Sequence, residues 1–388
     1  MRLKPGKTGH TLFAVALLTC ILLPLIQTIH PLVSNPPSNE NRALAPPPSF
    51  EGKIRPKRIK REFDAYFADN FGLRPHLLWF LERINVTLFR YSRRVIFGNN
   101  DWLYLKGNPG AERDYRQRIL FDLCVASTIT EFELDRWAST LIRNRQALRK
   151  RGIAYYFVVV PNKHTIHREN LPGYLVCDNP ATNLDRVLER VHREDPSLPI
   201  IDLRPALRHA KTTGNHLYYR TDTHWNPSGI LVGYNALFDV LSRSHRLRYA
   251  AEPDRIERRR FRVPGGDLAR LVGRGDKESE SVLGLRLKKP LARQADSPLP
   301  RLRSDPAKDP RTWVVEGSDA DRALIFHDSF FATSIRSLFS ETFSETTYVW
   351  RNYTEIDMAL VDRSAPDIVI HEFVERNLQG IFAQLRDE

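Results

Sequence analysis

Two short polar segments of this 388-residue chain hold residue types that can perform nucleophilic catalysis. One contains Asp222 and His224, two positions apart, and the other contains Ser329. A serine hydroxyl is a weak nucleophile until a neighbouring base takes its proton, and histidine can be that base. A carboxylate that orients the imidazole and stabilises its charged form completes such a triad. The three side chains therefore predict a nucleophile, a base and an orienting acid.

The same residues have plainer interpretations, which their spacing leaves open. Ser329 precedes a helical pattern and could simply cap that helix. Asp222 and His224 could be hydrogen-bonding partners within a loop, or two ligands of a metal ion. A metal site needs a third and a fourth ligand, and the other histidines are scattered rather than spaced as in a metal motif. We therefore predict no metal site.

Apolar runs alternate with helical patterns around these segments. The run at 153–160, IAYYFVVV, is typical of a central parallel strand buried on both faces. Helices are expected at 131–150, 183–194, 227–241 and 330–339, and further strands at 200–203, 323–326, 347–350 and 367–371. This alternation predicts a three-layer α/β fold with a central, mostly parallel sheet. Ligands of such sheets bind beyond the carboxyl ends of the strands, where both polar segments are expected.

Ser329 would stand directly between a strand and the helix that follows it. Such a turn holds the hydroxyl above the edge of the sheet. The backbone N–H groups and the dipole at the start of the helix would then stabilise a developing oxyanion.

The N-terminus has the pattern of a membrane-targeting segment. Basic residues precede an uncharged apolar stretch, which predicts a signal anchor over residues 1–29, with a cleaved signal peptide as the alternative. Residues 30–53, rich in Pro, Asn and Ser, predict an extended linker. A single domain is expected over 54–388, with a polar insertion around 251–320. Within that domain, an amphipathic helix begins near 54, a second covers 75–89, and a hairpin turns at 99–101.

The charge distribution bears on which partners the chain could bind, and the cysteines bear on its redox compartment. The formal charge is +13, but the basic residues are spread over many elements without a nucleic-acid module, so no nucleic-acid partner is predicted. The densest run, 255–262, is either a solvated face or a surface for anionic lipid or acidic polysaccharide. No glycine-rich phosphate loop is present, and no cofactor is predicted. Cys124 and Cys177 either pair in an oxidising compartment or remain free thiols.

Several motifs occur in an order and spacing that resemble one protein family. They are NRALA at 41–45, DNFGLR at 69–74, DWLY at 101–104, VPNK at 160–163, TDTHWNP at 221–227, GDL at 266–268 and DSF at 328–330. In these motifs the chain resembles the SGNH-hydrolase-like proteins of exopolysaccharide O-acetylation, the AlgJ and AlgX family. One departure is His327, where the family generally has glycine.

The resemblance implies a triad of Ser329, His224 and Asp222 that acetylates an exopolysaccharide such as alginate through an acyl-serine. Substrate contacts are expected from a set of nearby residues: Tyr219, Arg220, Trp225, Lys163 and Arg351. The resemblance also implies a polysaccharide acceptor, a multi-pass membrane acyltransferase as the donor partner, and a place on the periplasmic face of the inner membrane. Two alternatives remain, a polysaccharide acetyl esterase with the same triad and a non-catalytic scaffold of the acetylation complex.

Overall fold

The protein divides into two compact units. The computed structural model describes residues 7–36, 44–50, 55–107, 119–214, 216–301, 306–350 and 354–380. One unit comprises Met1–Ser92 with Leu271–Gly273, and the other comprises Arg93–Arg270 with Arg274–Glu388.

The first unit contains three helices, α1 (Lys7–Ile29), α2 (Pro56–Asn70) and α3 (Arg74–Phe89). Residues 10–29 of α1 are long and apolar enough to cross a membrane, as expected of an anchor. Helices α2 and α3 were predicted within the domain that starts near residue 54. They belong instead to the unit of α1, so the compact unit that holds Asp222, His224 and Ser329 begins at Arg93.

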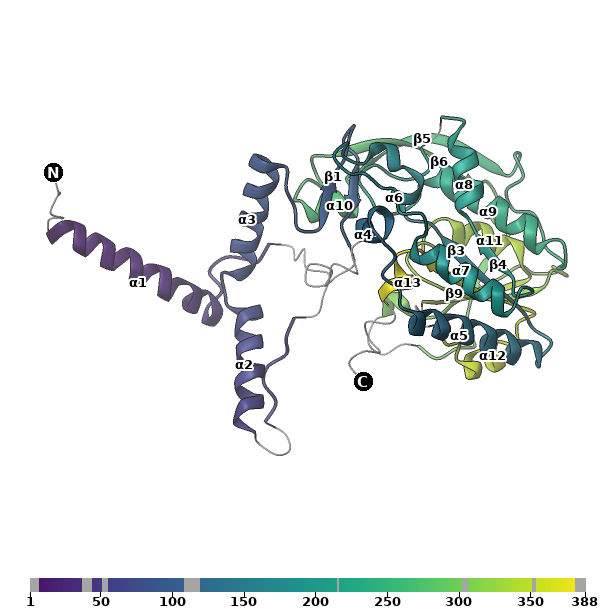
Figure 1. The fold of residues 1–388 in the computed structure, drawn as a ribbon, viewed down its shortest axis with the longest axis horizontal. Helices are drawn as coiled ribbons and strands as arrows, with labels where there is room; N and C mark the ends of the chain where they lie inside the picture. The colour runs from purple at the N-terminus through teal and green to yellow at the C-terminus, as the bar shows by residue number, and fades with distance from the viewer. Residues whose placement is uncertain are drawn as a thin grey trace. The chain divides into compact units, whose positions relative to one another are not determined.

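A seven-stranded sheet forms the centre of the second unit (Figure 1). Its strands in spatial order are β4 (Ile200–Asp202), β3 (Ala154–Val160), β11 (Ile368–Val374), β9 (Arg322–His327), β10 (Glu345–Trp350), β8 (Arg311–Val314) and β7 (Arg293–Ala295). The strands from β4 to β10 are parallel, and β8 and β7 add an antiparallel edge. The predicted α/β class with a mostly parallel sheet is therefore confirmed.

Helices cover both faces of this sheet. Successive residues of β3 belong to different core clusters, because side chains of a strand alternate between faces. Helices α8 (Arg204–Lys211), α9 (Pro227–Leu241) and α11 (Ile335–Thr342) pack on one face. Helices α5 (Glu131–Arg149), α7 (Asn183–Glu194) and α12 (Met358–Ser364) pack on the other. These are the three predicted layers.

Shorter elements surround the sheet. They are β1 (Val95–Phe97), β2 (Leu103–Leu105), α4 (Ile119–Cys124), α6 (Lys163–Ile166), β5 (Ile256–Pro264), α10 (Asp267–Leu271), β6 (Ser279–Leu287) and α13 (Asn377–Gly380). The hairpin β1–β2 turns at Asn100 and Asp101, both with positive φ, as its sequence indicated. The region 251–320 is not wholly an insertion, because β7 and β8 within it extend the central sheet.

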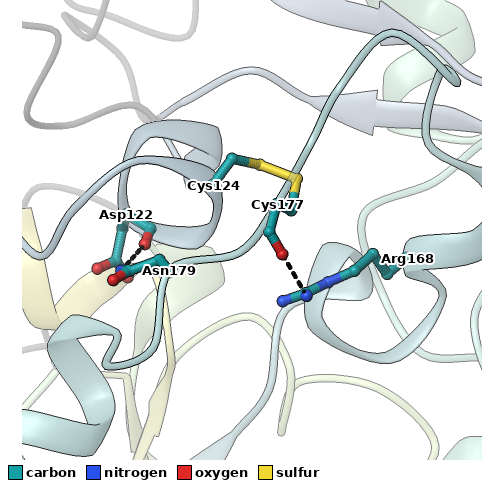
Figure 2. The surroundings of a disulfide bond; sticks show 5 residues. All are labelled: Asp122, Cys124, Arg168, Cys177 and Asn179. Atoms are coloured by element: carbon teal, nitrogen blue, oxygen red, sulfur yellow. Dashed lines mark hydrogen bonds between the residues drawn. A yellow bond between two sulfur atoms is a disulfide. The ribbon is translucent and has the colours of Figure 1, made fainter.

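A disulfide joins Cys124 and Cys177, which settles the question that the sequence left open. Figure 2 shows the bond between the end of α4 and the segment that precedes α7. Beside it, Asn179 donates to the backbone carbonyl of Asp122, and Arg168 donates to the carbonyl of Cys177. The bond and these two contacts therefore tie an otherwise irregular segment to the body of the unit.

Replacing both cysteines by serine is expected to lower the free energy of unfolding by about 2–4 kcal/mol, because the bond closes a long loop in the unfolded chain. Urea unfolding of the residue 93–388 unit measures this difference. Adding a reductant should reproduce it in the wild type and leave the double variant unchanged. A reductant that destabilises both proteins equally would contradict the assignment.

Candidate active site

The first part of the site is an irregular loop at residues 218–226, called here the Asp-His loop. An antiparallel bridge between Tyr218 and Trp225 closes it. Asn226 then caps α9, accepting hydrogen bonds from the N–H groups of Ser228 and Gly229, and Pro227 occupies the first helical position. The rigid start of α9 therefore fixes one end of the loop.

The loop and the segment after β9 bring Asp222, His224 and Ser329 together. Asp222 Oδ1 lies 2.7 Å from His224 Nδ1, and His224 Nε2 lies 2.9 Å from Ser329 Oγ. Asp222 Oδ1 also accepts a hydrogen bond from the backbone N–H of His224 at 3.0 Å. These are the contacts of a nucleophile, a base and an orienting carboxylate.

Ser329 lies in a turn and not at the start of a helix, contrary to our prediction. Helix α11 begins only at Ile335. The turn is held by Asp328, whose Oδ1 accepts from the N–H of Phe330 and whose Oδ2 accepts from the N–H of Val374. A helix dipole at Ser329 is therefore not part of the site. The N–H of Ser329 donates to no acceptor among the described residues.

Asp222 is a half-buried carboxylate. Burial by itself would raise its pKa, but the hydrogen bond with His224, together with the charge of that ring when it is protonated, holds the pKa well below its usual range. The backbone N–H of Asp267 donates to Asp222 Oδ2 at 2.8 Å and acts in the same direction. Asp222 is therefore ionised wherever the protein is folded at ordinary pH.

Asp267 supports the loop from a distant part of the chain, and sequence reasoning did not assign it a role. Its carboxylate accepts hydrogen bonds from the N–H and hydroxyl of Thr223. The preceding Gly266 lies so close to Asp222 that a Cβ atom at residue 266 would approach the Asp222 Cβ to 2.3 Å. Burial and the charge of Asp222 raise the pKa of Asp267. The GDL motif was the only signal in the sequence that pointed to this segment.

Glu280 of β6 holds the backbone of the same loop, and no sequence signal identified it. Its carboxylate accepts hydrogen bonds from the N–H groups of Arg220 and Thr221 and from the Thr221 hydroxyl. The segment around β6 therefore contributes directly to the shape of the site.

Lys163, expected to bind substrate, instead binds the Asp-His loop from the interior. Its Nζ donates to the backbone carbonyls of Tyr219, Arg220 and Asp222 at 2.8–3.0 Å. Three acceptors require three N–H donors, which only the ammonium form has. Burial lowers the pKa of this amine to about 7, and the neighbouring carboxylates oppose that shift. The side chain is buried and fully used within the protein, so we correct its role to loop support.

The other residues expected to contact substrate divide into three groups. Trp225 is fully buried, and its indole N–H donates to the carbonyl of Phe330, so it is a core residue rather than a substrate contact. Tyr219 and Arg220 are half-buried in the Asp-His loop and remain candidates. Arg351 lies outside the described residues.

His327 is buried, and its side chain packs against the neighbouring strand β10. Its ring contacts Tyr348 and Trp350 of β10, with centroid distances of 5.9 and 5.6 Å. Its Nδ1 bonds to the carbonyl of Asp328 at 2.7 Å. The side chain that replaces glycine in the family motif is therefore accommodated in the core.

Asp222, His224 and Asp267 also form a cluster whose ligand atoms lie within 4.8 Å of one another. Each of the four carboxylate oxygens in this cluster already accepts a hydrogen bond from the protein. This arrangement favours a hydrogen-bonded network over a cation site.

The comparisons with known proteins identify a family for this chain. Residues 95–298 match the model of the family described as "SGNH hydrolase-like domain, acetyltransferase AlgX". Two relatives are the probable alginate O-acetylases AlgJ of Pseudomonas putida, 29% identical over 155 residues, and of Pseudomonas aeruginosa, 26% identical over 216 residues. These alignments cover 38% and 54% of this chain and 39% and 48% of the relatives. The chain thus spans less than half the length of these curated relatives.

A solved structure shows the same fold. Bacillus cereus PatB1 with a sulfonyl adduct superposes with a TM-score of 0.51 at 14% identity, over 73% of this chain and 97% of PatB1. The family model covers more than half of the chain, including the Asp-His loop, Gly266, Asp267 and Glu280. The chain therefore belongs to the family of SGNH hydrolase-like acetyltransferase domains of the AlgX type.

Proposed function

We propose that this protein transfers acetyl groups through Ser329 to hydroxyl groups of an exopolysaccharide outside the cytoplasm. The observation that carries the proposal is the continuous contact from Asp222 through His224 to the Ser329 hydroxyl. The family contributes the reaction type, O-acetyl transfer.

The first half-reaction forms an acetyl-serine. His224 Nε2 takes the proton of the Ser329 hydroxyl while Oγ attacks the carbonyl carbon of the acetyl donor. Asp222 holds the other ring nitrogen and stabilises the imidazolium that forms. When the tetrahedral intermediate collapses, the bond to the donor oxygen breaks, and that oxygen takes the proton from His224.

The second half-reaction releases the acetyl group to the acceptor. A sugar hydroxyl gives its proton to His224 and attacks the acetyl carbonyl carbon. The ester bond to Ser329 then breaks, and Oγ recovers the proton. In both halves the Ser329 N–H, which has no acceptor among the described residues, is available to the oxyanion.

The proposed location is the periplasmic face of the inner membrane. Helix α1 would span the membrane, with the basic residues before it on the cytoplasmic side. The disulfide agrees with an oxidising compartment. We further propose that a multi-pass membrane acyltransferase supplies the acetyl group, because no cofactor motif of this chain would do so.

The acceptor surface that we propose is the arginine strand β5. Arg258, Arg259, Arg260 and Arg262 are exposed, and none forms an ion pair within the part of the chain that the structure describes. The strand runs directly into Gly266 and Asp267 beside the triad. Arginine binds carboxylates through its planar fork of donors. The surface therefore fits an anionic polysaccharide.

Changing Ser329 or His224 to alanine is expected to reduce turnover of an aryl acetate by at least about 10³-fold, because nucleophile and base act as one unit. The wild-type 93–388 unit should gain the mass of one acetyl group on Ser329. An unchanged rate in a folded Ser329→Ala protein would exclude the acyl-serine mechanism.

Changing Asp222 to asparagine should alter how stability depends on pH. The folded-state pKa of Asp222 lies below its unfolded value of about 3.9, so its stabilising contribution is present above about pH 4 and is lost as the pH falls further. The difference in unfolding free energy between wild type and D222N should shrink below that pH. Urea titrations from neutral to acidic pH measure it, and a constant difference would contradict the ionised state.

Removing positive charge from β5 should weaken binding of the acceptor polysaccharide without changing the reaction with the acetyl donor. In the triple variant R258Q/R260Q/R262Q, acetyl transfer to polygalacturonate should show a raised KM, while hydrolysis of the aryl acetate without acceptor stays unchanged. The matched control R149Q/R208Q/R243Q removes the same charge from other exposed positions. If both triple variants raised the KM equally, the net charge of the protein, and not β5 in particular, would account for acceptor binding.

A further inference from the structure

Helix α3 exposes an apolar stripe that a water-soluble helix would bury. Leu77, Phe80, Leu81, Ile84 and Leu88 follow the spacing of one helical face. Four of the five are exposed, with Leu77 at 53% and Leu88 at 69%. Val86, the only residue of α3 that is buried, lies on the opposite side of the helix. Leu78, Trp79 and Phe89, which lie off the stripe, are exposed as well, so the stripe is part of a larger exposed apolar surface.

Helix α2 repeats the pattern on a smaller scale. No residue of α2 is buried, and the amphipathic face predicted from its sequence remains exposed at Phe63 and Phe67. The two rings stack on each other with centroids 6.4 Å apart. Both helices between the expected anchor and the second unit therefore carry exposed apolar side chains.

A contact at Gly72 fixes where this pair of helices meets α1. The N–H of Gly72 donates to the Thr28 hydroxyl at 2.8 Å. A Cβ atom at residue 72 would lie 2.5 Å from the Thr28 nitrogen and 2.7 Å from the Pro24 carbonyl oxygen, so only glycine fits. The start of α3 therefore lies at the level of the last turns of α1, within about 8 Å of its end at Ile29.

The charges around the stripe match a membrane surface. Residues 55–94 contain ten Lys or Arg and four Asp or Glu. Trp79 is exposed on the side of α3 opposite the stripe, and the Arg83 guanidinium lies over its ring. Trp at the level of the headgroups and basic residues near anionic lipids are typical of interfacial helices.

We infer that α3 lies in the lipid headgroup region, with its stripe of Leu77, Phe80, Leu81, Ile84 and Leu88 turned into the acyl chains of a bilayer that contains anionic lipid. The inference rests on the membrane-spanning role proposed for α1 and is independent of the acyl-transfer chemistry. Three residues, 90–92, join α3 to the second unit. The acyl-transfer unit would thus be held at the membrane by a second attachment beside α1.

Depth-dependent quenching tests this inference on the full-length protein in vesicles of phosphatidylethanolamine and phosphatidylglycerol. The native Cys20 of α1, an exposed free thiol, carries the fluorophore in the reference sample. In a Cys20→Ser background, Leu77→Cys, Leu81→Cys and Glu82→Cys carry it in turn. Nitroxide-labelled acyl chains should quench the two stripe positions several-fold more than Glu82→Cys.

Further outcomes decide between lipid and other occupants. Gly72→Ala should reduce quenching at Leu81→Cys, because its Cβ meets the backbone of α1, whereas Gly173→Ala, with open space around it, should not. Quenching at Cys20 without quenching on the stripe would overturn the role of α3, and no quenching at Cys20 would refute the anchor itself. Loss of quenching on the stripe when a membrane acyltransferase is co-reconstituted would identify a protein partner as the occupant instead.

Discussion

The half-buried negative charge of Asp222 is the constraint on which the rest of the site depends. A carboxylate removed from water must be paired or hydrogen-bonded, because an unpaired charge in the interior is very costly. Here one oxygen of Asp222 accepts hydrogen bonds from the ring and backbone N–H groups of His224, and the other accepts one from the N–H of Asp267. The first pair of bonds orients the imidazole toward Ser329. The last bond makes that orientation depend on a segment 45 positions later in the chain.

The Asp-His loop has little regular structure, so buried charges take the place of a hydrogen-bonded ladder. Every buried backbone N–H and carbonyl needs a partner. Lys163 donates hydrogen bonds to three carbonyls of the loop, and Glu280 accepts hydrogen bonds from two of its N–H groups. The two side chains satisfy opposite ends of the peptide units along the same short stretch. Removing either one would leave several groups without partners at once, which is why both act as supports of the active-site geometry.

The sequence predicted the elements whose local signals are strong. Strand β3 follows from an unbroken apolar run that ends in three valines, and α9 from the Asn226–Pro227 cap. The turn at Ser329 was mistaken for a helix because Phe330 and Phe331 continue an apolar pattern, but both fill the core. Their turn is held by the Asp328 side chain, a tertiary contact that no periodicity reveals. Trp225 and Lys163 were wrongly predicted to contact substrate. A sequence motif does not distinguish a residue that touches substrate from one that holds the loop in place.

The charges around His224 favour the proton transfer that the proposed mechanism requires. Asp222 is ionised beside the imidazole, and its charge raises the pKa of Asp267. A protein environment with this sign stabilises the imidazolium that appears when Ser329 loses its proton. Lys163 balances the carboxylates from behind the loop, where its ammonium meets carbonyls and not the imidazole. The network therefore places negative charge beside Nδ1 of the ring, which faces Asp222, and leaves Nε2 to exchange a proton with Ser329.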